Sequence, residues 1–141
     1  MKKKLLVFFS VILLLLGDYL YWTLPRPLNT DLPEEIYSSV KADLIYYDRY
    51  FTPKDIEVDE AQLADILNAL AQTEVTRRPK FRTMSQPFFY LYLYYPDGYT
   101  VMTVVENGNL VVTPNMYRDR HVYFDGGEEL YQVLLGLRPS P

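Results

Sequence analysis

The most regular hydrophobic pattern in the chain predicts an amphipathic helix over residues 60–71. Its apolar positions recur at helical spacing and fall on one side, namely Leu63, Ile66, Leu67 and Leu70. Asp59 is a preferred N-cap residue, and Gln62 three positions later completes a capping box. A shorter stripe of the same kind in EELYQVLLGL predicts a final helix over residues 127–136.

Between residues 88 and 113 the pattern changes to the alternation that is typical of strands. The run FFYLYLYY is followed by the turn sequence PDG, and a second turn, Asn107-Gly108, is followed by LVVT. We predict three consecutive antiparallel strands here, an earlier strand over residues 40–47 and a further one over residues 121–124. The predicted fold class is α+β, with a four- to five-stranded, mainly antiparallel sheet and two helices packed on one face.

The PDG turn also predicts how the two strands beside it pair. If Gly98 forms a bulge, Tyr95 lies opposite Tyr99 and the register follows. The first strand then has an apolar face made of Phe89, Leu91 and Leu93. Its other face is made of Tyr90, Tyr92 and Tyr94. We expect the apolar face to pack against the helices, which leaves the tyrosine face solvated, covered by the first strand and loops, or used for binding.

The N-terminal pattern predicts a membrane anchor. Three lysines precede an apolar run over residues 5–16, which as a helix spans only about 18 Å, the length of a signal peptide. Extended through residue 24, the helix reaches about 30 Å, which is enough to cross a bilayer. The chain before Gly17 and before Thr23 lacks the small residues that signal cleavage prefers. We therefore expect an uncleaved signal anchor over residues 1–24, with a cleaved signal peptide as the alternative.

The same segment predicts the orientation of the protein. The N-terminal lysines stay in the cytoplasm by the positive-inside rule, and Tyr19, Tyr21 and Trp22 suit the aromatic belt at the far interface. We expect a single-pass protein of the cell membrane that contacts the bilayer through residues 5–24. A proline-rich stalk over residues 25–35 would then connect the anchor to an extracytoplasmic α+β domain over residues 36–138.

Charge and composition narrow the possible functions. The chain has 14 basic and 18 acidic residues, and leaving out the anchor's three lysines and Asp18 gives a net charge of −6. A domain this acidic lacks the phosphate-neutralising charge of nucleic-acid-binding proteins. There is no cysteine, which excludes disulfides, thiolate metal sites and cysteine nucleophiles. Phosphate-binding glycine motifs are absent from the sequence as well, so we expect no cofactor.

Residues that could carry chemistry are few. His121 is the only histidine, and it can act as a general base only if the fold brings it to a carboxylate such as Asp119 or Asp125. The alternating acids Asp55, Glu57 and Asp59 resemble the start of a calcium loop, but the required glycine and the bidentate glutamate are missing. We interpret them as a solvated strand end that leads into a helix N-cap, and we expect no metal site.

Two surfaces are candidates for binding. The first is the tyrosine face with Tyr46 or Tyr47 nearby, because tyrosine offers a large contact area and a polar tip; alternatively, these rings simply cover the second face of a thin sheet. The second is a basic loop made of Arg77, Arg78, Lys80 and Arg82. It suits anionic wall polymers or lipid headgroups, and the alternative is an ordinary solvated loop.

The order of these elements is similar to that of a known group of proteins. The segments DEAQLADILNAL, Pro87 with FYLYLYYPDG, and EELYQVLLGL resemble an uncharacterised family of small extracytoplasmic single-domain proteins of Gram-positive bacteria, often lipoproteins. The resemblance covers roughly residues 40–137 and implies the location and the fold, without an activity. The missing cysteine departs from the lipoprotein form, so the anchor helix would replace the lipid.

These observations favour a non-catalytic, membrane-anchored extracytoplasmic binding or assembly module that uses the tyrosine face. An envelope protein or an anionic cell-wall polymer is the expected partner, and nucleic acid is not. The alternatives are an envelope hydrolase built around His121 and an inhibitor or sensor that is accessory to a membrane protein.

Overall fold

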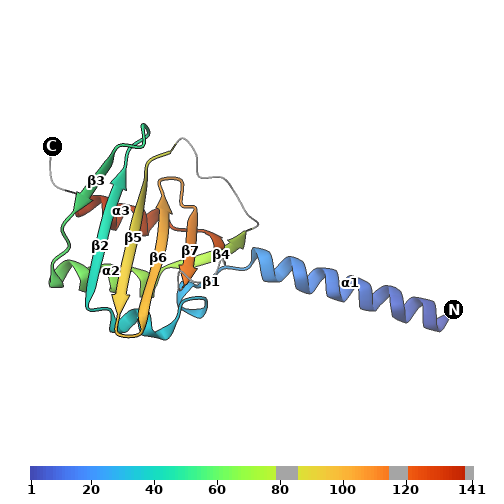
Figure 1. Ribbon diagram of the computed structural model, residues 1–141. Helices are drawn as coiled ribbons and strands as arrows, with labels where there is room; N and C mark the ends of the chain where they lie inside the picture. Colours follow the sequence, from blue (N-terminus) through green and yellow to red (C-terminus); the bar gives the residue numbers. More distant parts are fainter. Residues whose placement is uncertain (79–85, 115–120, 139–141) are drawn as a thin grey trace.

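The computed structural model of the chain describes residues 1–78, 86–114 and 121–138 (Figure 1). Its strands are β1 (Arg26–Pro27), β2 (Lys41–Tyr47), β3 (Pro53–Ile56), β4 (Glu74–Arg78), β5 (Phe88–Tyr95), β6 (Gly98–Val105), β7 (Leu110–Pro114) and β8 (Val122–Asp125). Its helices are α1 (Lys2–Thr23), α2 (Glu60–Gln72) and α3 (Glu128–Gly136), with short 3-10 helices η1 (Leu28–Thr30) and η2 (Glu34–Ser38).

All eight strands form one antiparallel sheet in the order β1-β4-β8-β7-β6-β5-β2-β3. Helices α2 and α3 contact each other and cover the same face of the sheet (Figure 1). The antiparallel α+β architecture is therefore confirmed, whereas the predicted number of four to five strands was too low. The additional strands β1, β3 and β4 are short, and β3 and β4 each bury a single apolar side chain, Ile56 and Val75, so they leave no alternation to detect.

Helix α2 forms as predicted. The backbone N–H of Gln62 donates to Asp59 Oδ1 at 2.7 Å, and the backbone N–H of Asp59 donates to Gln62 Oε1 at 2.9 Å. This reciprocal capping box satisfies donors that the first helical turn would otherwise leave without a partner. Leu63, Ile66 and Leu70 are buried on the side of α2 that faces the sheet.

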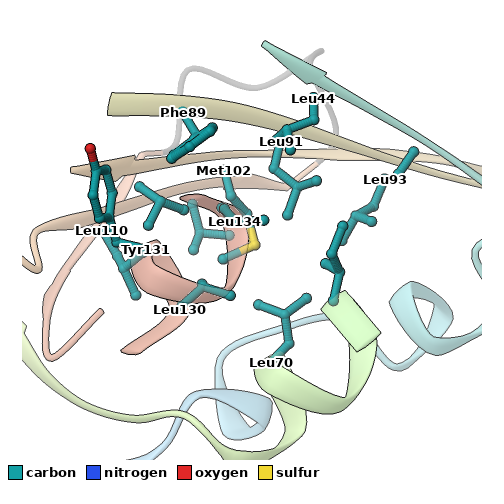
Figure 2. Packing of buried hydrophobic residues seen from close by; sticks show 14 of the residues in the cluster. Leu44, Leu70, Phe89, Leu91, Leu93, Met102, Leu110, Leu130, Tyr131 and Leu134 are labelled. Carbon is teal, nitrogen blue, oxygen red and sulfur yellow. The ribbon is translucent and has the colours of Figure 1, made fainter. Parts of the chain in front are cut away.

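The core lies between the sheet and these helices (Figure 2). Phe89, Leu91 and Leu93 of β5 are completely buried and point towards the helices, as predicted. The side chains that meet them come from both helices and from neighbouring strands; they include Leu70, Leu130, Leu134, Met102 and Leu110.

The pairing of β5 with β6 differs from the predicted register by one residue. Tyr95 pairs with Gly98, so the turn is the two-residue loop Pro96-Asp97 and the expected bulge is not formed. The shift reverses the sides of β6, because successive strand residues point to opposite faces. It places the large apolar Met102 opposite Leu91 in the core, where the predicted register would have placed Thr103.

The one-residue shift also buries a polar side chain. Thr100 is fully buried, and its hydroxyl shares a hydrogen bond of 3.0 Å with the hydroxyl of Tyr95. Each of these hydroxyls supplies the partner that the other needs away from water. The turn region is therefore compatible with the apolar core that surrounds it.

Helix α1 projects from the domain and none of its residues is buried (Figure 1). It is long and apolar enough to cross a membrane. The segment that follows, which we expected to be a stalk, packs onto the domain: Leu28 and Leu32 are buried, and the Leu28 N–H donates to the Thr73 carbonyl at 2.9 Å. This burial depends on α2, which supplies the surface that η1 contacts.

We predict that Gly126→Ala destabilises the domain by about 1–3 kcal/mol. Gly126 has a φ of +108°, which disfavours side chains, and a Cβ there would lie 2.6 Å from the Glu74 carbonyl oxygen. Gly136→Ala is the matched control, because a Cβ at this end of α3 meets nothing within 4 Å. Guanidinium unfolding of the detergent-solubilised chain, followed by circular dichroism, measures both variants. Equal stability of the two would contradict the close approach of β4 to Gly126.

Candidate functional site

A strip of aromatic rings crosses β2, β5 and β6 on the face of the sheet opposite the helices. It consists of Tyr47, Phe51, Phe88, Tyr90, Tyr92, Tyr94 and Tyr99. We call it the aromatic strip. Its members on β5 are the alternate residues of a strand whose other side faces the core. Figure 1 shows α2 and α3 behind these strands, so no described helix covers the strip.

One half of the strip is a tight cluster around Phe88. The sheet register pairs Tyr47 with Phe88, and their rings stack with centroids 4.9 Å apart and an interplanar angle of 10°. Tyr90 contacts both rings edge-on, at 5.3 Å from Tyr47 and 5.1 Å from Phe88. Such offset and edge-to-face contacts stabilise aromatic clusters beyond simple burial. This half of the strip is therefore a preorganised surface.

The other half of the strip carries the polar groups. Tyr94 lies 6.4 Å from Tyr92 and 5.7 Å from Tyr99 between ring centroids, and the Lys41 ammonium lies 5.7 Å from the Tyr94 ring. Lys41 is also paired with Asp43 at 3.6 Å. The charges of Lys41 and Asp43 thus balance each other at this end of the strip.

Two phenol groups of the strip, those of Tyr90 and Tyr94, have a raised pKa and stay protonated. Desolvation is the main cause that raises the pKa of Tyr90, and the neighbouring Tyr47 and Tyr92 raise it further. Desolvation and then hydrogen bonding to Asp43 raise the pKa of Tyr94. Tyr90 therefore presents a neutral hydroxyl that can donate a hydrogen bond to a ligand at physiological pH, whereas the Tyr94 hydroxyl donates to Asp43 and can accept one.

The loop between β2 and β3 extends the strip. Asp48 Oδ1 accepts hydrogen bonds from the backbone N–H groups of Tyr50 at 2.9 Å and Thr52 at 3.0 Å, and the Thr52 bond is the main cause that lowers the pKa of Asp48. Within this turn Phe51 adopts a φ of 59°, which is uncommon for a bulky residue. Tyr50 is 82% exposed and Phe51 is 51% exposed. The Asp48 carboxylate thus orders the backbone of the turn that carries these two exposed rings.

The predicted tyrosine face is brought together, since Tyr90, Tyr92 and Tyr94 lie on one side of β5 and are partly buried. Of the two candidates beside it, Tyr47 joins the strip, whereas Tyr46 is buried on the core side 5.0 Å from Phe89. Sequence reasoning missed the contribution of Phe51 to the strip and the exposed Tyr50 that precedes it. The signal was present in YYDRYF, where an aspartate precedes two aromatic residues at a turn.

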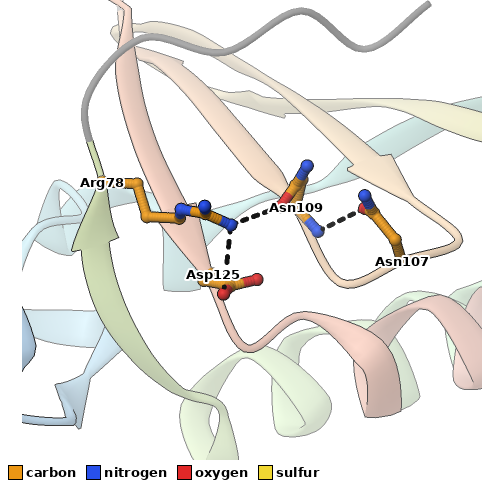
Figure 3. A network of polar contacts seen from close by, with 4 residues as sticks. All are labelled: Arg78, Asn107, Asn109 and Asp125. Carbon is orange, nitrogen blue, oxygen red and sulfur yellow. Dashed lines mark hydrogen bonds and ion pairs between the residues drawn. The ribbon is translucent and has the colours of Figure 1, made fainter.

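The predicted basic loop is only partly described. Arg77 and Arg78 lie on β4, and Lys80 and Arg82 fall outside the described residues. Arg78 donates to Asn109 Oδ1 at 3.4 Å and pairs with Asp125 at 3.3 Å, which ties β4 to the end of β8 and to the turn before β7 (Figure 3). Three strands separate β4 from β5 in the sheet, so the arginines and the aromatic strip form separate surfaces.

Of the residues proposed for hydrolysis, the two that the structure describes, His121 and Asp125, do not meet. His121 Nδ1 shares a hydrogen bond of 2.7 Å with the Thr113 hydroxyl just before β8 begins, while Asp125 lies at the other end of β8 and pairs with Arg78. Asp119 lies outside the described residues. Within residues 1–78, 86–114 and 121–138, no group of three His, Cys, Asp or Glu side chains is placed to hold a metal ion.

We predict that Asp48→Ala lowers the hydrogen-exchange protection of the Tyr50 and Thr52 amides by about fivefold, the effect of losing one net hydrogen bond. Asp48→Asn is the matched control, because it keeps an acceptor oxygen without the charge. In the wild type the protection should persist from neutral pH down to about pH 4, since the lowered pKa keeps the carboxylate ionised there. Unchanged protection in Asp48→Ala would show that the carboxylate does not order the loop.

Comparisons of the chain with protein-family models, with curated proteins and with solved structures found no match. The resemblance to extracytoplasmic domains of Gram-positive bacteria therefore stays a prediction from the sequence, and the functional argument depends on the surfaces described above.

Proposed function

We propose that this protein is a non-catalytic, membrane-anchored extracytoplasmic module that binds an envelope protein through the aromatic strip. The observation that carries the proposal is the exposure, partial in most cases, of six of the seven rings of the aromatic strip, all but the buried Phe88, on a sheet face that no described helix covers. Tyrosine-rich patches of this kind bury a large area on binding while losing little side-chain entropy.

The strip supports a protein partner over an anionic polymer. The outward positions of β2 and β5 carry only two charged residues, Lys41 and Asp43, which neutralise each other. The chain beyond the anchor is acidic overall, so a polyanion would meet repulsion, and the described strands β2, β5 and β6 of the strip offer it no unpaired cation. Phenol hydroxyls and partly exposed rings instead suit the mixed apolar and polar surface of a protein.

The anchor supports a partner in the same envelope. Helix α1 is long and apolar enough to cross a membrane, and it continues directly into the segment that packs on the domain. With the lysine-rich end in the cytoplasm, the domain is held at the outer surface of the membrane. Tethering raises the effective concentration of the strip towards other membrane proteins, so a modest interface suffices.

We predict that changing Tyr90, Tyr92 and Tyr94 to threonine abolishes a specific crosslink to an envelope protein in intact cells. Threonine keeps the strand propensity and leaves the core face of β5 unchanged, so the domain should stay folded. Crosslinking with mass spectrometry on wild-type and variant cells measures the loss, and circular dichroism of the purified variant checks the fold.

The matched control changes three exposed polar residues on α2, Asp65, Asn68 and Gln72, to alanine, and it should keep the crosslink. If the tyrosine variant unfolds, Phe51→Ser repeats the test at a ring that is half exposed. Retention of every protein crosslink in folded strip variants would refute the proposal. Crosslinks to wall polymer alone would replace the protein partner with the polymer.

A further inference from the structure

The end of α1 and strand β4 enclose an open hollow between the anchor and the domain. Its lining consists of Trp22, Thr23, Thr76, Arg77, Arg78 and Asp125. Arg77 donates a hydrogen bond to the Tyr21 hydroxyl, and its guanidinium lies 5.8 Å from the Tyr21 ring. The cations that sequence analysis placed in a loop are thus partly located where the chain leaves α1.

Ion pairs within the fold leave one of the arginines near the hollow without a carboxylate partner among the described residues. Arg26 pairs with Asp31 at 3.0 Å, and Arg78 pairs with Asp125 at 3.3 Å. In the part of the chain that the structure describes, Arg77 has no carboxylate within ion-pair distance. The hollow therefore carries an excess positive charge on an otherwise acidic protein.

The aromatic residues of α1 set the level at which the hollow lies relative to the membrane. Tyr19, Tyr21 and Trp22 lie in the last turns of α1, next to the domain, and such rings prefer the level of the lipid headgroups. Trp22 itself lines the hollow. When α1 crosses the membrane, the guanidinium of Arg77 is held at the height where lipid phosphates lie.

We propose that this hollow binds the phosphate of an anionic lipid headgroup in the outer leaflet, with Arg77 as the main contact. A guanidinium presents parallel N–H donors that match two phosphate oxygens, and it attracts anionic lipids more strongly when it is near the bilayer surface. The inference rests on the membrane anchoring in the proposed function, and it does not require the aromatic strip to bind anything.

Trp22 provides the measurement, because it is the only tryptophan in the chain and it lines the hollow. The full-length protein is reconstituted in two kinds of vesicle, both made of phosphatidylcholine and phosphatidylglycerol. In one kind the phosphatidylcholine carries bromine high on its acyl chains, and in the other the phosphatidylglycerol does, at the same mole fraction of brominated lipid. Quenching of Trp22 then reports which lipid lies beside it. We expect a relative association constant of about five in favour of phosphatidylglycerol, as one cation near the surface provides.

Variants assign the preference to the hollow. Arg77→Gln should bring the relative association constant close to one. Arg77→Lys should keep part of the preference for phosphatidylglycerol, since lysine keeps the positive charge but lacks the paired N–H donors of the guanidinium. Lys54→Gln is the matched control, because it removes the same charge from an exposed position on β3, at the far edge of the sheet from β4. A loss of preference in the control equal to that in Arg77→Gln would overturn the assignment.

The wild type alone also tests the proposal, whatever the variants do. Equal quenching by the two brominated lipids would overturn the headgroup site while leaving the anchor intact. Quenching by neither would show that α1 is not inserted, and both proposals on the membrane would fall. If soluble glycerol phosphate abolishes the preference for phosphatidylglycerol, the hollow binds free phosphate. If the preference persists, the result supports the lipid as the source of the bound phosphate.

Discussion

The pairing of β5 with β2 and β6 is the constraint on which the rest of the structure depends. Successive residues of a strand point to opposite faces, so this one strand places Phe89, Leu91 and Leu93 in the core and three tyrosines on the outer surface. A slip of one residue would exchange the two sets. The core and the aromatic strip are therefore two sides of the same register.

This arrangement explains how a thin domain tolerates so much aromatic surface. The two helices cover one face of the sheet, and the partly buried rings cover much of the other by packing against one another. The Tyr47–Phe88 stack and the Tyr90 edge contacts contribute to stability whether or not a partner is bound. Stability and recognition are compatible here, because packing one edge of a ring leaves its hydroxyl and outer edge available.

The polar groups of the domain act mainly as ties between elements. The Asp59 and Gln62 pair begins α2, the Tyr95 and Thr100 hydroxyls satisfy each other in the core, and Arg78 joins β4 to Asn109 and Asp125. These groups have partners inside the fold, whereas most rings of the aromatic strip are partly exposed and Arg77 has no carboxylate partner among the described residues.

The sequence by itself determined the local features of this protein. The capping box and leucine stripe define α2, strand alternation separates the apolar and tyrosine faces of β5, and the apolar run defines an N-terminal helix long enough to cross a membrane. Each of these signals depends on neighbours only a few residues apart, so it can be identified without the rest of the chain.

Only the tertiary structure decided the remaining features. The β6 register depends on the packing of Met102 against the helices, and the short strands β1 and β4 exist because β8 provides an edge for β4 and β4 in turn pairs with β1. The placement of Arg77 beside the end of α1 joins residues that are more than fifty positions apart. Such features are set by contacts between distant segments, whose energies no local pattern of residues contains.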